Sequence, residues 1–460
     1  MSLAESIVCA LTGIVGAEFV RTDPAALEPY GVDALGQGHR PDLVVIPANT
    51  REVAAVASLC NAERVPLVVR GAGTGYTGGA VPTRGGVVLS MERFTRILEI
   101  DRTNLLAVVE PNVINADLQR AVEAVGLFYP PDPASLETSA LGGNVAECAG
   151  GPRAFKYGTT RRYVLALEAV LPTGEIIETG SKAVKNVVGY DLTQLLVGSE
   201  GTLAIVTRIT LRLIPKPPAC ATLLAIFTDV QAAVDAVTAL IERRVVPSAI
   251  ELVDAESLQV VRDRLGEELA PPTAGALLLV EADGSQTAVD EEIDQVAQAC
   301  RGVGAMRVTL AADDAEREKL WDARRLISLA LRATGLLKIN HDVVVPRGRI
   351  PELFAAIDEL RERYGLTIAA FGHAGDGNIH VNLMIDRADA DERRRAKEAE
   401  RVLFERVVAL EGSISGEHGI GFAKAPYLGL ELSPEEIALM KRVKAAFDPN
   451  GILNPGKIFP

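Results

Sequence analysis

The chain is poor in cysteines, aromatic residues and histidines for its length. Five cysteines are scattered over 460 residues without a C-x-x-C pair, and aromatic residues make up only 4%. Cysteine-ligated iron–sulfur clusters and structural zinc sites need closely spaced thiols, so a recognisable motif of either kind is excluded. Scattered cysteines also fit a reducing compartment.

Long hydrophobic runs and an excess of basic residues are missing too. Apolar residues make up 48% of the chain, but glycine, proline and charged residues interrupt them, so we expect no membrane-spanning helix. The first residues, MSLAE, lack the basic start of a signal peptide. The net charge of −14 argues against a nucleic-acid partner. These features predict a cytoplasmic globular protein.

Strand and helix patterns predict an α+β protein in two parts. An amphipathic helix over residues 51–64 leads into a strand over 65–70, and further strands follow in the first half. The proline-rich segment 215–218 is interpreted as a linker. Beyond it, strands alternate with helices, which predicts an antiparallel sheet with helices on one face. We expect domains at 1–217 and 218–460.

A glycine-rich segment, GAGTGYTGGA over 71–80, follows the strand predicted over 65–70. A Rossmann loop passes directly into a helix, whereas Pro82 and a new strand follow here. Glycines still let consecutive backbone N–H groups approach a pyrophosphate, so the segment is either a phosphate cradle or a flexible surface loop. Two further segments, YPPDPAS (129–135) and SALGGNVAECAGG (139–151), favour the cradle, because their small side chains leave room for a flat ligand.

Three of the five histidines lie in two other glycine-rich segments. If the Asp-Gly dipeptide between them forms a two-residue hairpin, His373 and His380 lie directly opposite each other, close enough to share one ion. Glu417 and His418 supply a carboxylate and a third imidazole. Two histidines and a carboxylate leave coordination positions open, which is typical of a catalytic metal site. The alternative is that each histidine is a structural residue.

The motifs together resemble the FAD domain of the vanillyl-alcohol-oxidase-type (PCMH-type) flavoproteins. In the first half the resemblance rests on RGAGTG (70–75), PPDPAS (130–135), LGGN (141–144), AGG (149–151) and GSEGTLAIVT (198–207). The second half resembles the branch of FAD-linked 2-hydroxy-acid dehydrogenases, which includes the flavin subunit of glycolate oxidase and D-lactate dehydrogenase. The motifs there are FGHAGDGNIH (371–380), GEHGIG (416–421) and DPNGILNPGK (448–457).

The resemblance implies a PCMH-type FAD-binding domain of two α/β subdomains, followed by an α+β substrate domain whose last 30 or so residues return to the flavin. The residues that it assigns to FAD binding are Arg70, Gly71, Ala72, Gly73, Thr74, Thr77, Gly78, Gly79, Pro131, Asp132, Ser139, Gly142, Gly143, Asn144, Ile205 and Asn454. Some relatives attach FAD through a histidine or cysteine in the first loop. No such residue lies between Arg70 and Ala80, so we expect non-covalent FAD.

Oxidation of a 2-hydroxy acid requires a cation for the carboxylate, a base for the hydroxyl proton and a hydride acceptor, here the flavin. The resemblance assigns a divalent metal to His373, His380 and Glu417, and the base to His418. Zinc is expected, with manganese or iron as alternatives. The residues assigned to substrate binding are Arg324, Ser328 and Lys338 by resemblance, and Asn382 by its place on the strand face of His380.

We expect oxidation of glycolate or D-lactate to the 2-oxo acid, with electrons passed to an iron–sulfur partner subunit, a quinone or a cytochrome. Such a partner would bring the protein to the inner membrane, and an oligomer is compatible with these features. Three alternatives stay open: a stand-alone D-lactate or D-2-hydroxyglutarate dehydrogenase, a flavin-binding subunit without turnover, and a metal-only oxygenase, against which the FAD motifs argue.

Overall fold

The structure is a computed structural model that describes residues 3–459. The side chains of residues 263–265 and 267–269 are outside the description. Within the described part of the chain, every helix is too short or too polar to cross a lipid bilayer.

The chain divides into two compact units. The first comprises residues up to Gly150, Thr159–Lys216 and the segment from Glu417 onward, and the second comprises Gly151–Gly158 and Pro217–Gly416. The main division follows Lys216, next to the expected boundary. The C-terminal segment that belongs to the first unit is longer than the 30 or so residues expected.

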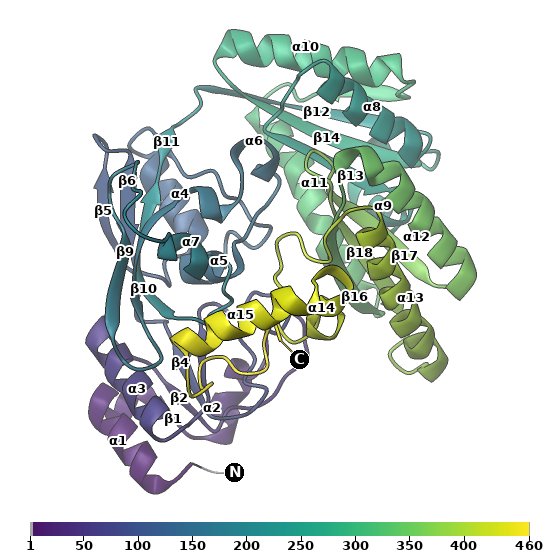
Figure 1. The fold of residues 1–460 in the computed structure, drawn as a ribbon. Helices are drawn as coiled ribbons and strands as arrows, with labels where there is room; N and C mark the ends of the chain where they lie inside the picture. The colour runs from purple at the N-terminus through teal and green to yellow at the C-terminus, as the bar shows by residue number, and fades with distance from the viewer. Residues whose placement is uncertain (1–2, 460) are drawn as a thin grey trace. The chain divides into compact units, whose positions relative to one another are not determined.

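Besides a two-stranded sheet, the described part of the first unit contains two sheets of different construction (Figure 1). The smaller has the order β1–β2–β4–β3, in which β2, β4 and β3 run parallel. The larger is antiparallel, with the order β5–β6–β10–β8–β9. The strands are β1 (Val20–Arg21), β2 (Leu43–Val45), β3 (Leu67–Arg70), β4 (Val87–Ser90), β5 (Ile97–Asp101), β6 (Leu106–Val109), β8 (Val164–Val170), β9 (Ile176–Gly180) and β10 (Ile205–Arg212).

The helix predicted over 51–64 is confirmed as α3 (Thr50–Ala62), which packs on the smaller sheet. Val53 and Cys60 recur at helical spacing and are buried with Leu67 and Leu89 of the sheet. The other elements of this unit are α1 (Glu5–Val15), α2 (Pro24–Leu27), α4 (Asn115–Glu123), α5 (Leu141–Glu147), α7 (Leu192–Leu196), α14 (Leu428–Glu431), α15 (Pro434–Phe447), and the paired strands β7 (Leu127–Phe128) and β11 (Ile214–Pro215).

The second unit is built on one antiparallel sheet with the order β15–β12–β14–β13–β17–β18–β16. Its strands are β12 (Ala219–Phe227), β13 (Ala249–Asp254), β14 (Ala276–Gly284), β15 (Arg307–Leu310), β16 (Leu337–Val344), β17 (Thr367–His373) and β18 (Asn378–Ile385). The helices are α6 (Ala154–Tyr157), α8 (Val230–Glu242), α9 (Ala255–Leu269), α10 (Gln286–Gly302), α11 (Asp314–Ala333), α12 (Ile350–Tyr364) and α13 (Ala390–Ala409).

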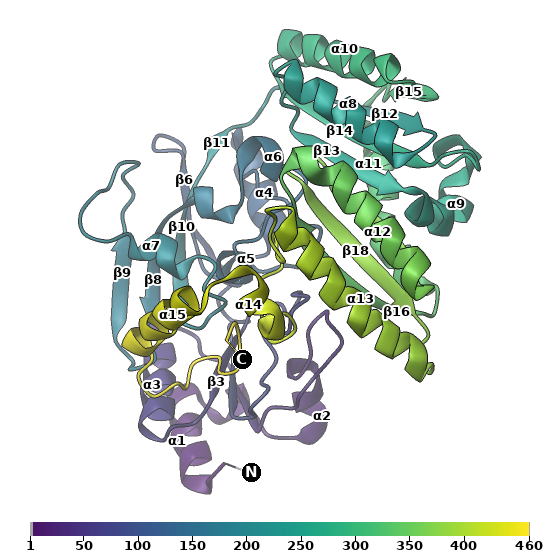
Figure 2. The same ribbon diagram turned by 45° about the vertical axis from the view of Figure 1, so that its right-hand side comes forward.

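Figure 2 shows α8, α10, α12 and α13 over one face of this sheet. The helices α9 and α11 pack on the opposite face, where Leu258 and Ile327 share a hydrophobic cluster with Leu224, Leu279 and Phe371 of the strands. Side chains alternate between the two faces of a strand, and here both faces bury apolar residues. The expectation of helices on one face therefore holds for only part of the sheet.

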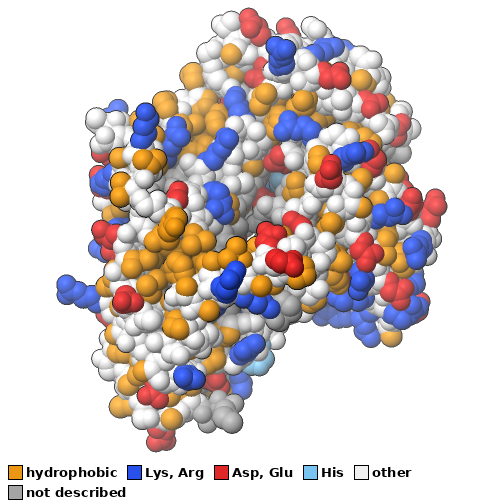
Figure 3. Space-filling view, in the orientation of Figure 1, with side chains coloured by type: hydrophobic (Ala, Val, Ile, Leu, Met, Phe, Trp, Pro, Cys, Tyr) orange, Lys and Arg blue, Asp and Glu red, His pale blue; other side chains and the backbone are white. Residues whose placement is uncertain are grey.

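The surface has a mixed character (Figure 3). Acidic and basic side chains both occur over the helices of the second unit. In the first unit, the segment between β9 and α7 exposes apolar side chains, with Val187 97%, Val188 90% and Tyr190 94% exposed.

Candidate active site

The glycine-rich loop after β3 has a defined backbone. Gly73 has φ +71°, and a Cβ there would lie 2.2 Å from Nη2 of Arg70. Gly78 has φ +80°, and a Cβ there would lie 2.0 Å from the Phe422 ring. Arg70 is buried and donates a hydrogen bond to the carbonyl of Val32. Because these two positions require glycine, the backbone rather than side chains dominates the loop.

The start of α5 lies beside this loop. An added Cβ at Gly71 would be 3.9 Å from the Gly143 nitrogen and 3.9 Å from Asn112 Oδ1. Gly142 packs against Pro111, only 2.6 Å from where its Cβ would be, whereas no atom lies within 4 Å of a Cβ at Gly143. A side chain at position 142 would therefore clash with Pro111, whereas a side chain at position 143 would enter open space.

Three polar side-chain atoms of this part of the unit are unsatisfied. Within the described chain, Asn112 Oδ1, Ser139 Oγ and Asn144 Nδ2 are buried without a hydrogen-bond partner. Nearly all buried polar groups in proteins have a partner. The loop, the open side of Gly143 and these three atoms together suit a flat, polar ligand that approaches the backbone closely.

The C-terminal segment braces the glycine-rich loop. Asn454 Nδ2 donates hydrogen bonds to the carbonyls of Gly79 (2.9 Å) and Glu200 (2.7 Å), and Lys457 Nζ donates to the Val81 carbonyl (2.6 Å). Burial lowers the pKa of Lys457 to about 8. Direct contact of Asn454 with FAD stays a prediction, because its amide group holds the loop in this structure.

The other predicted cofactor residues differ in exposure. Ile205 is buried in the hydrophobic cluster of the smaller sheet, and Asp132 and Pro131 are buried in their rigid loop. Ala72 is exposed, and Thr74 is half-buried.

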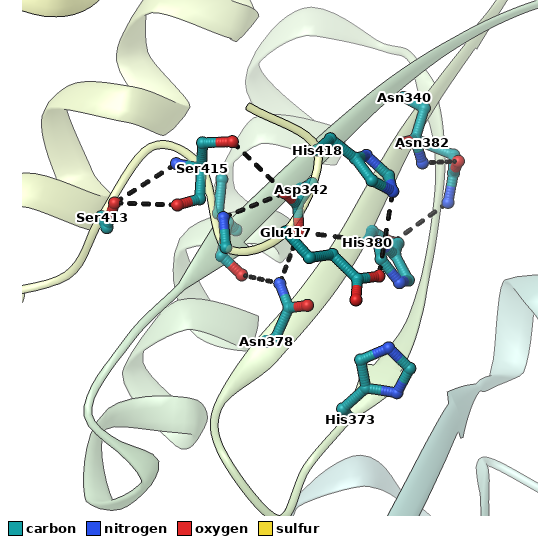
Figure 4. Close-up of polar contacts among 12 residues, drawn as sticks. Asn340, Asp342, His373, Asn378, His380, Asn382, Ser413, Ser415, Glu417 and His418 are labelled. Carbon is teal, nitrogen blue, oxygen red and sulfur yellow. Dashed lines mark hydrogen bonds and ion pairs between the residues drawn. The ribbon is translucent and has the colours of Figure 1, made fainter. Parts of the chain in front are cut away.

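Glu417 and His418 lie beside the glycine-rich loop in the first unit. The His418 ring stacks on Tyr76 with 5.1 Å between centroids, and its carbonyl accepts a hydrogen bond from Thr77 Oγ1. Glu417 Oε1 lies 3.8 Å from His418 Nε2 (Figure 4). Glu200 holds the next turn by accepting two backbone hydrogen bonds, of 2.7 and 2.6 Å. The predicted base is therefore held by the unit that carries the loop.

Three buried carboxyl groups support these loops and were not predicted. Burial raises the pKa of Glu200, and burial together with the Glu200 charge raises that of Glu147. Burial also raises the pKa of Asp33 to about 6. The only signal in the sequence is an acidic residue among small ones, which does not distinguish a buried acid from an exposed one.

The strands β17 and β18 carry His373 and His380 (Figure 4). In their register His373 pairs with Asn378, and His380 pairs with Phe371. The prediction of a two-residue turn with opposed histidines is therefore wrong. The loop spans 374–377, and Gly377, with φ +87°, closes it by donating to the His373 carbonyl. Both histidines still point to one face, so their rings meet diagonally, 5.3 Å between centroids.

A buried carboxylate on the neighbouring strand joins two predicted site residues. Glu251 on β13 pairs in register with His373 and is fully buried. Its Oε1 is 2.5 Å from Nδ1 of His373, and its Oε2 forms an ion pair of 2.6 Å with Arg324 on α11. Burial opposes ionisation of Glu251, but His373 and Arg324 outweigh it and lower the pKa of its carboxyl group. The Arg324 guanidinium also lies over the Phe371 ring, 4.6 Å from its centroid.

The remaining predicted substrate residues lie on the same face. Lys338 Nζ on β16 donates a 2.7 Å hydrogen bond to Ser328 Oγ on α11. Burial, followed by the charges of Arg332 and Arg324, lowers the pKa of Lys338 to about 7. Together these groups offer two cationic side chains and a hydroxyl, which suits a carboxylate.

Asn382 lies two residues from His380, as predicted, but its amide group is engaged. It is fully buried, donates to the carbonyls of Ala369 and His380, and accepts a 2.7 Å hydrogen bond from Asn340. Its contact with substrate stays a prediction. Asn340 is a polar neighbour that sequence reasoning missed.

Asp342 on β16 links the sheet to the segment that leads to Glu417. Its Oδ1 accepts a 2.6 Å hydrogen bond from Asn378, and its Oδ2 accepts one of 2.9 Å from the Gly416 nitrogen (Figure 4). Nδ1 of His380 is 3.9 Å from Asp342 Oδ1, beyond hydrogen-bond distance. Gly416 directly precedes Glu417, so the hydrogen bond to Asp342 holds the backbone next to the predicted carboxylate ligand.

Known proteins match this chain over nearly its whole length. Residues 216–458 match the family described as FAD linked oxidases, C-terminal domain, and residues 41–180 match the FAD binding domain. Glycolate oxidase subunit GlcD of Bacillus subtilis is 45% identical, over 94% of this chain and 92% of that protein. D-lactate dehydrogenase of Anaerostipes hadrus is 37% identical, over 91% of this chain and 90% of that protein. The chain belongs to the FAD-linked oxidase family.

The fold comparison agrees. The structure of p-cresol methylhydroxylase aligns over 99% of this chain and 96% of its own, with a TM-score of 0.82 at 20% identity. The predicted PCMH-type FAD-binding fold is therefore confirmed, as is the family resemblance. As a member of the FAD-linked oxidases, the chain is an FAD-dependent oxidoreductase.

FAD fits the first unit. The backbone around Gly73 and Gly78 would lie against the pyrophosphate, the open side of Gly143 would admit a flat ring system, and Asn112, Ser139 and Asn144 would supply polar atoms. The side chains of the second unit likewise suit a divalent metal. Two buried imidazoles lie on one face of the sheet, and one of them is hydrogen-bonded to a carboxylate.

Proposed function

We propose that this FAD-linked oxidase oxidises a small 2-hydroxy acid, glycolate or D-lactate, to the corresponding 2-oxo acid. The observation that carries the proposal is the polar face of the second unit, where Arg324, Ser328 and Lys338 lie on the same face as His373 and His380. The printed names of two relatives, a glycolate oxidase subunit and a D-lactate dehydrogenase, support this substrate class.

The chain's residues divide the work as follows. Arg324 and Lys338 hold the substrate carboxylate, with Ser328 as a hydrogen-bonding partner. His373, His380 and Glu417 would hold a divalent metal, zinc in the first place, which would lower the pKa of the substrate hydroxyl. His418 then removes the hydroxyl proton as general base. The flavin supplies the hydride acceptor when it is bound.

We infer that FAD is bound without a covalent link, because the loop from Arg70 to Ala80 has no histidine or cysteine. Acid precipitation should therefore release all flavin into the supernatant. Flavin that stays with the precipitated chain would show a covalent bond.

The electrons then leave through another protein or a small carrier. The five cysteines form no cluster motif, so we propose an iron–sulfur partner subunit, a quinone or a cytochrome as acceptor. A partner at the inner membrane would place this chain at the membrane surface. A stand-alone D-lactate or D-2-hydroxyglutarate dehydrogenase is the second candidate, supported by the D-lactate dehydrogenase relative.

An anaerobic substrate panel tests the proposal. Purified protein is mixed with glycolate, D-lactate, L-lactate and D-2-hydroxyglutarate, and flavin absorbance is followed. Bleaching by glycolate or D-lactate is the expected result, and selective bleaching by D-2-hydroxyglutarate would favour the second candidate. A bound flavin that no acid reduces would indicate a subunit without turnover.

A further inference from the structure

We infer that Glu251 is a positioning residue that sets both the metal affinity and the substrate affinity of the second unit. The inference rests on the proposed function, because it concerns the metal and carboxylate sites proposed there. Glu251 lies 122 residues before His373 in the chain, yet β13 and β17 place the two side by side in register. Its two carboxylate oxygens reach one member of each site.

The contacts of Glu251 differ from those of an ordinary structural acid. It is fully buried, its charge is paired with Arg324 at 2.6 Å, and its Oε1 lies 2.5 Å from Nδ1 of His373 in a hydrogen bond. A buried carboxylate is costly unless it is paired, so removing Arg324 would leave this charge uncompensated. Glu281, on the same sheet face, is also buried, but its carboxylate accepts hydrogen bonds from Thr222 and Trp321, neither of which is a proposed site residue.

For His373, the contact decides which ring nitrogen is available. A carboxylate that accepts at Nδ1 keeps the proton there and leaves the Nε2 lone pair for a metal ion. For His380, the Oδ1 of Asp342 lies 3.9 Å from Nδ1, beyond hydrogen-bond distance. Glu251 therefore orients one imidazole of the pair much more tightly than Asp342 orients the other.

For Arg324, the same carboxylate limits the position of the guanidinium. The ion pair with Glu251 and the Phe371 ring, 4.6 Å from Cζ of Arg324, hold the group from two directions. A held guanidinium loses less entropy when it binds a carboxylate. Loss of Glu251 should therefore weaken metal binding and substrate binding together.

The test is Glu251→Gln, with Glu281→Gln as the matched control. A glutamine that accepts from Arg324 presents its NH2 group to His373, so the ring must accept at Nδ1 and carry its proton on Nε2. Zinc affinity, measured by chelator competition on FAD-loaded protein, should fall about 10- to 100-fold. Excess zinc should restore kcat, while KM for the 2-hydroxy acid stays raised. Glu281→Gln should match the parent in zinc affinity and KM.

The outcomes separate this inference from the proposed function. If the parent binds zinc and is reduced by a 2-hydroxy acid, but Glu251→Gln has the parent's zinc affinity and KM, the positioning role is overturned. The role is also overturned if Glu281→Gln loses as much zinc affinity as Glu251→Gln, because the effect would then be a general one of buried charge. A parent that binds no zinc and reacts with no 2-hydroxy acid overturns the proposed function itself.

Discussion

The two units position ligand-binding groups in different ways. In the first, loops contain glycines at positive φ, and a Cβ at Gly73 or Gly78 would be strained and would meet Arg70 or Phe422. In the second, strand register brings side chains together from β13, β16, β17 and β18. A cofactor cradle of the first kind depends on the absence of side chains, whereas a site of the second kind depends on their exact partners. Damage to one should therefore leave the other intact.

The largest effect should come from the metal site. His380→Ala removes a proposed ligand, so turnover should fall on the order of 10,000-fold, corresponding to several kcal/mol of lost metal assistance, while FAD stays bound. Steady-state kinetics measures the turnover. Metal analysis and the flavin spectrum of the same sample measure the metal content and the FAD content. The control is His341→Gln, a buried histidine on β16 that contacts Glu400 and Phe404 on α13. Unchanged metal content in His380→Ala would remove this residue from the site.

A residue of the first unit should affect chemistry without affecting cofactor content. His418→Ala should slow flavin reduction on the order of 1,000-fold, a typical contribution of a general base. Anaerobic stopped-flow mixing with the 2-hydroxy acid measures this rate directly. Reduction near the parental rate with FAD and metal bound would assign the proton to another group.

Adjacent glycines test the cofactor cradle. Gly143→Leu adds a side chain to the open space, and overpacking of 1 to 3 kcal/mol would weaken FAD binding by up to about 100-fold. Apo-protein stability and metal content should stay near the parent's. Gly142→Leu, which meets Pro111, should instead lower the thermal stability of the apo-protein. Equal FAD affinity in Gly143→Leu and the parent would place the flavin elsewhere.

The carboxylate site should depend on guanidinium geometry. Arg324→Lys keeps the charge but not the planar fork, so kcat/KM should fall about 30-fold with FAD and metal retained. The adjacent Arg325 is paired with Glu318 and Asp322 on its own helix, so Arg325→Lys should have no effect. Steady-state kinetics of the two variants tests this prediction. Equal kcat/KM values for the two variants would exclude Arg324 from substrate binding.

The smallest effect should depend on pH. The pKa of Lys338 is lowered to about 7, so its positive charge is present below this pH and lost as the pH rises through it. If Lys338 attracts the substrate carboxylate, kcat/KM of the parent should fall above about pH 7. Lys338→Gln should lie about tenfold below the parent at pH 6 and equal it at pH 9. A parallel pH profile in both proteins would contradict this role.

Much of the fold was predictable because glycine-rich motifs and strand patterns are local signals. The helix at α3 and the proximity of His373 to His380 follow from such signals, whereas the PCMH-type fold was implied by the family resemblance. Pairing register was not predictable in the same way. The loop at 374–377 is longer than the Asp-Gly dipeptide suggests, because Gly377 bonds back to His373 and shifts the partner of each histidine.

Contacts between residues distant in sequence could not be predicted either. Glu251 lies in the short strand AIELVD, where a single acid between apolar residues marks only a charged side chain on one face. Its contact with His373 arises from the pairing of β13 with β17, which no local pattern specifies. The missed acids at 147 and 200 are similar, because their burial depends on loops that come together only in the folded unit.

The central claim is that FAD held by the first unit is reduced by a 2-hydroxy acid only when a metal is held by histidines of the second. The most direct measurement is the anaerobic half-reaction of protein stripped of metal by a chelator and still loaded with FAD. We predict that glycolate or D-lactate leaves the flavin oxidised, and that adding back zinc, or the metal found in the parent, causes it to bleach. Bleaching at the parental rate without metal would contradict the account.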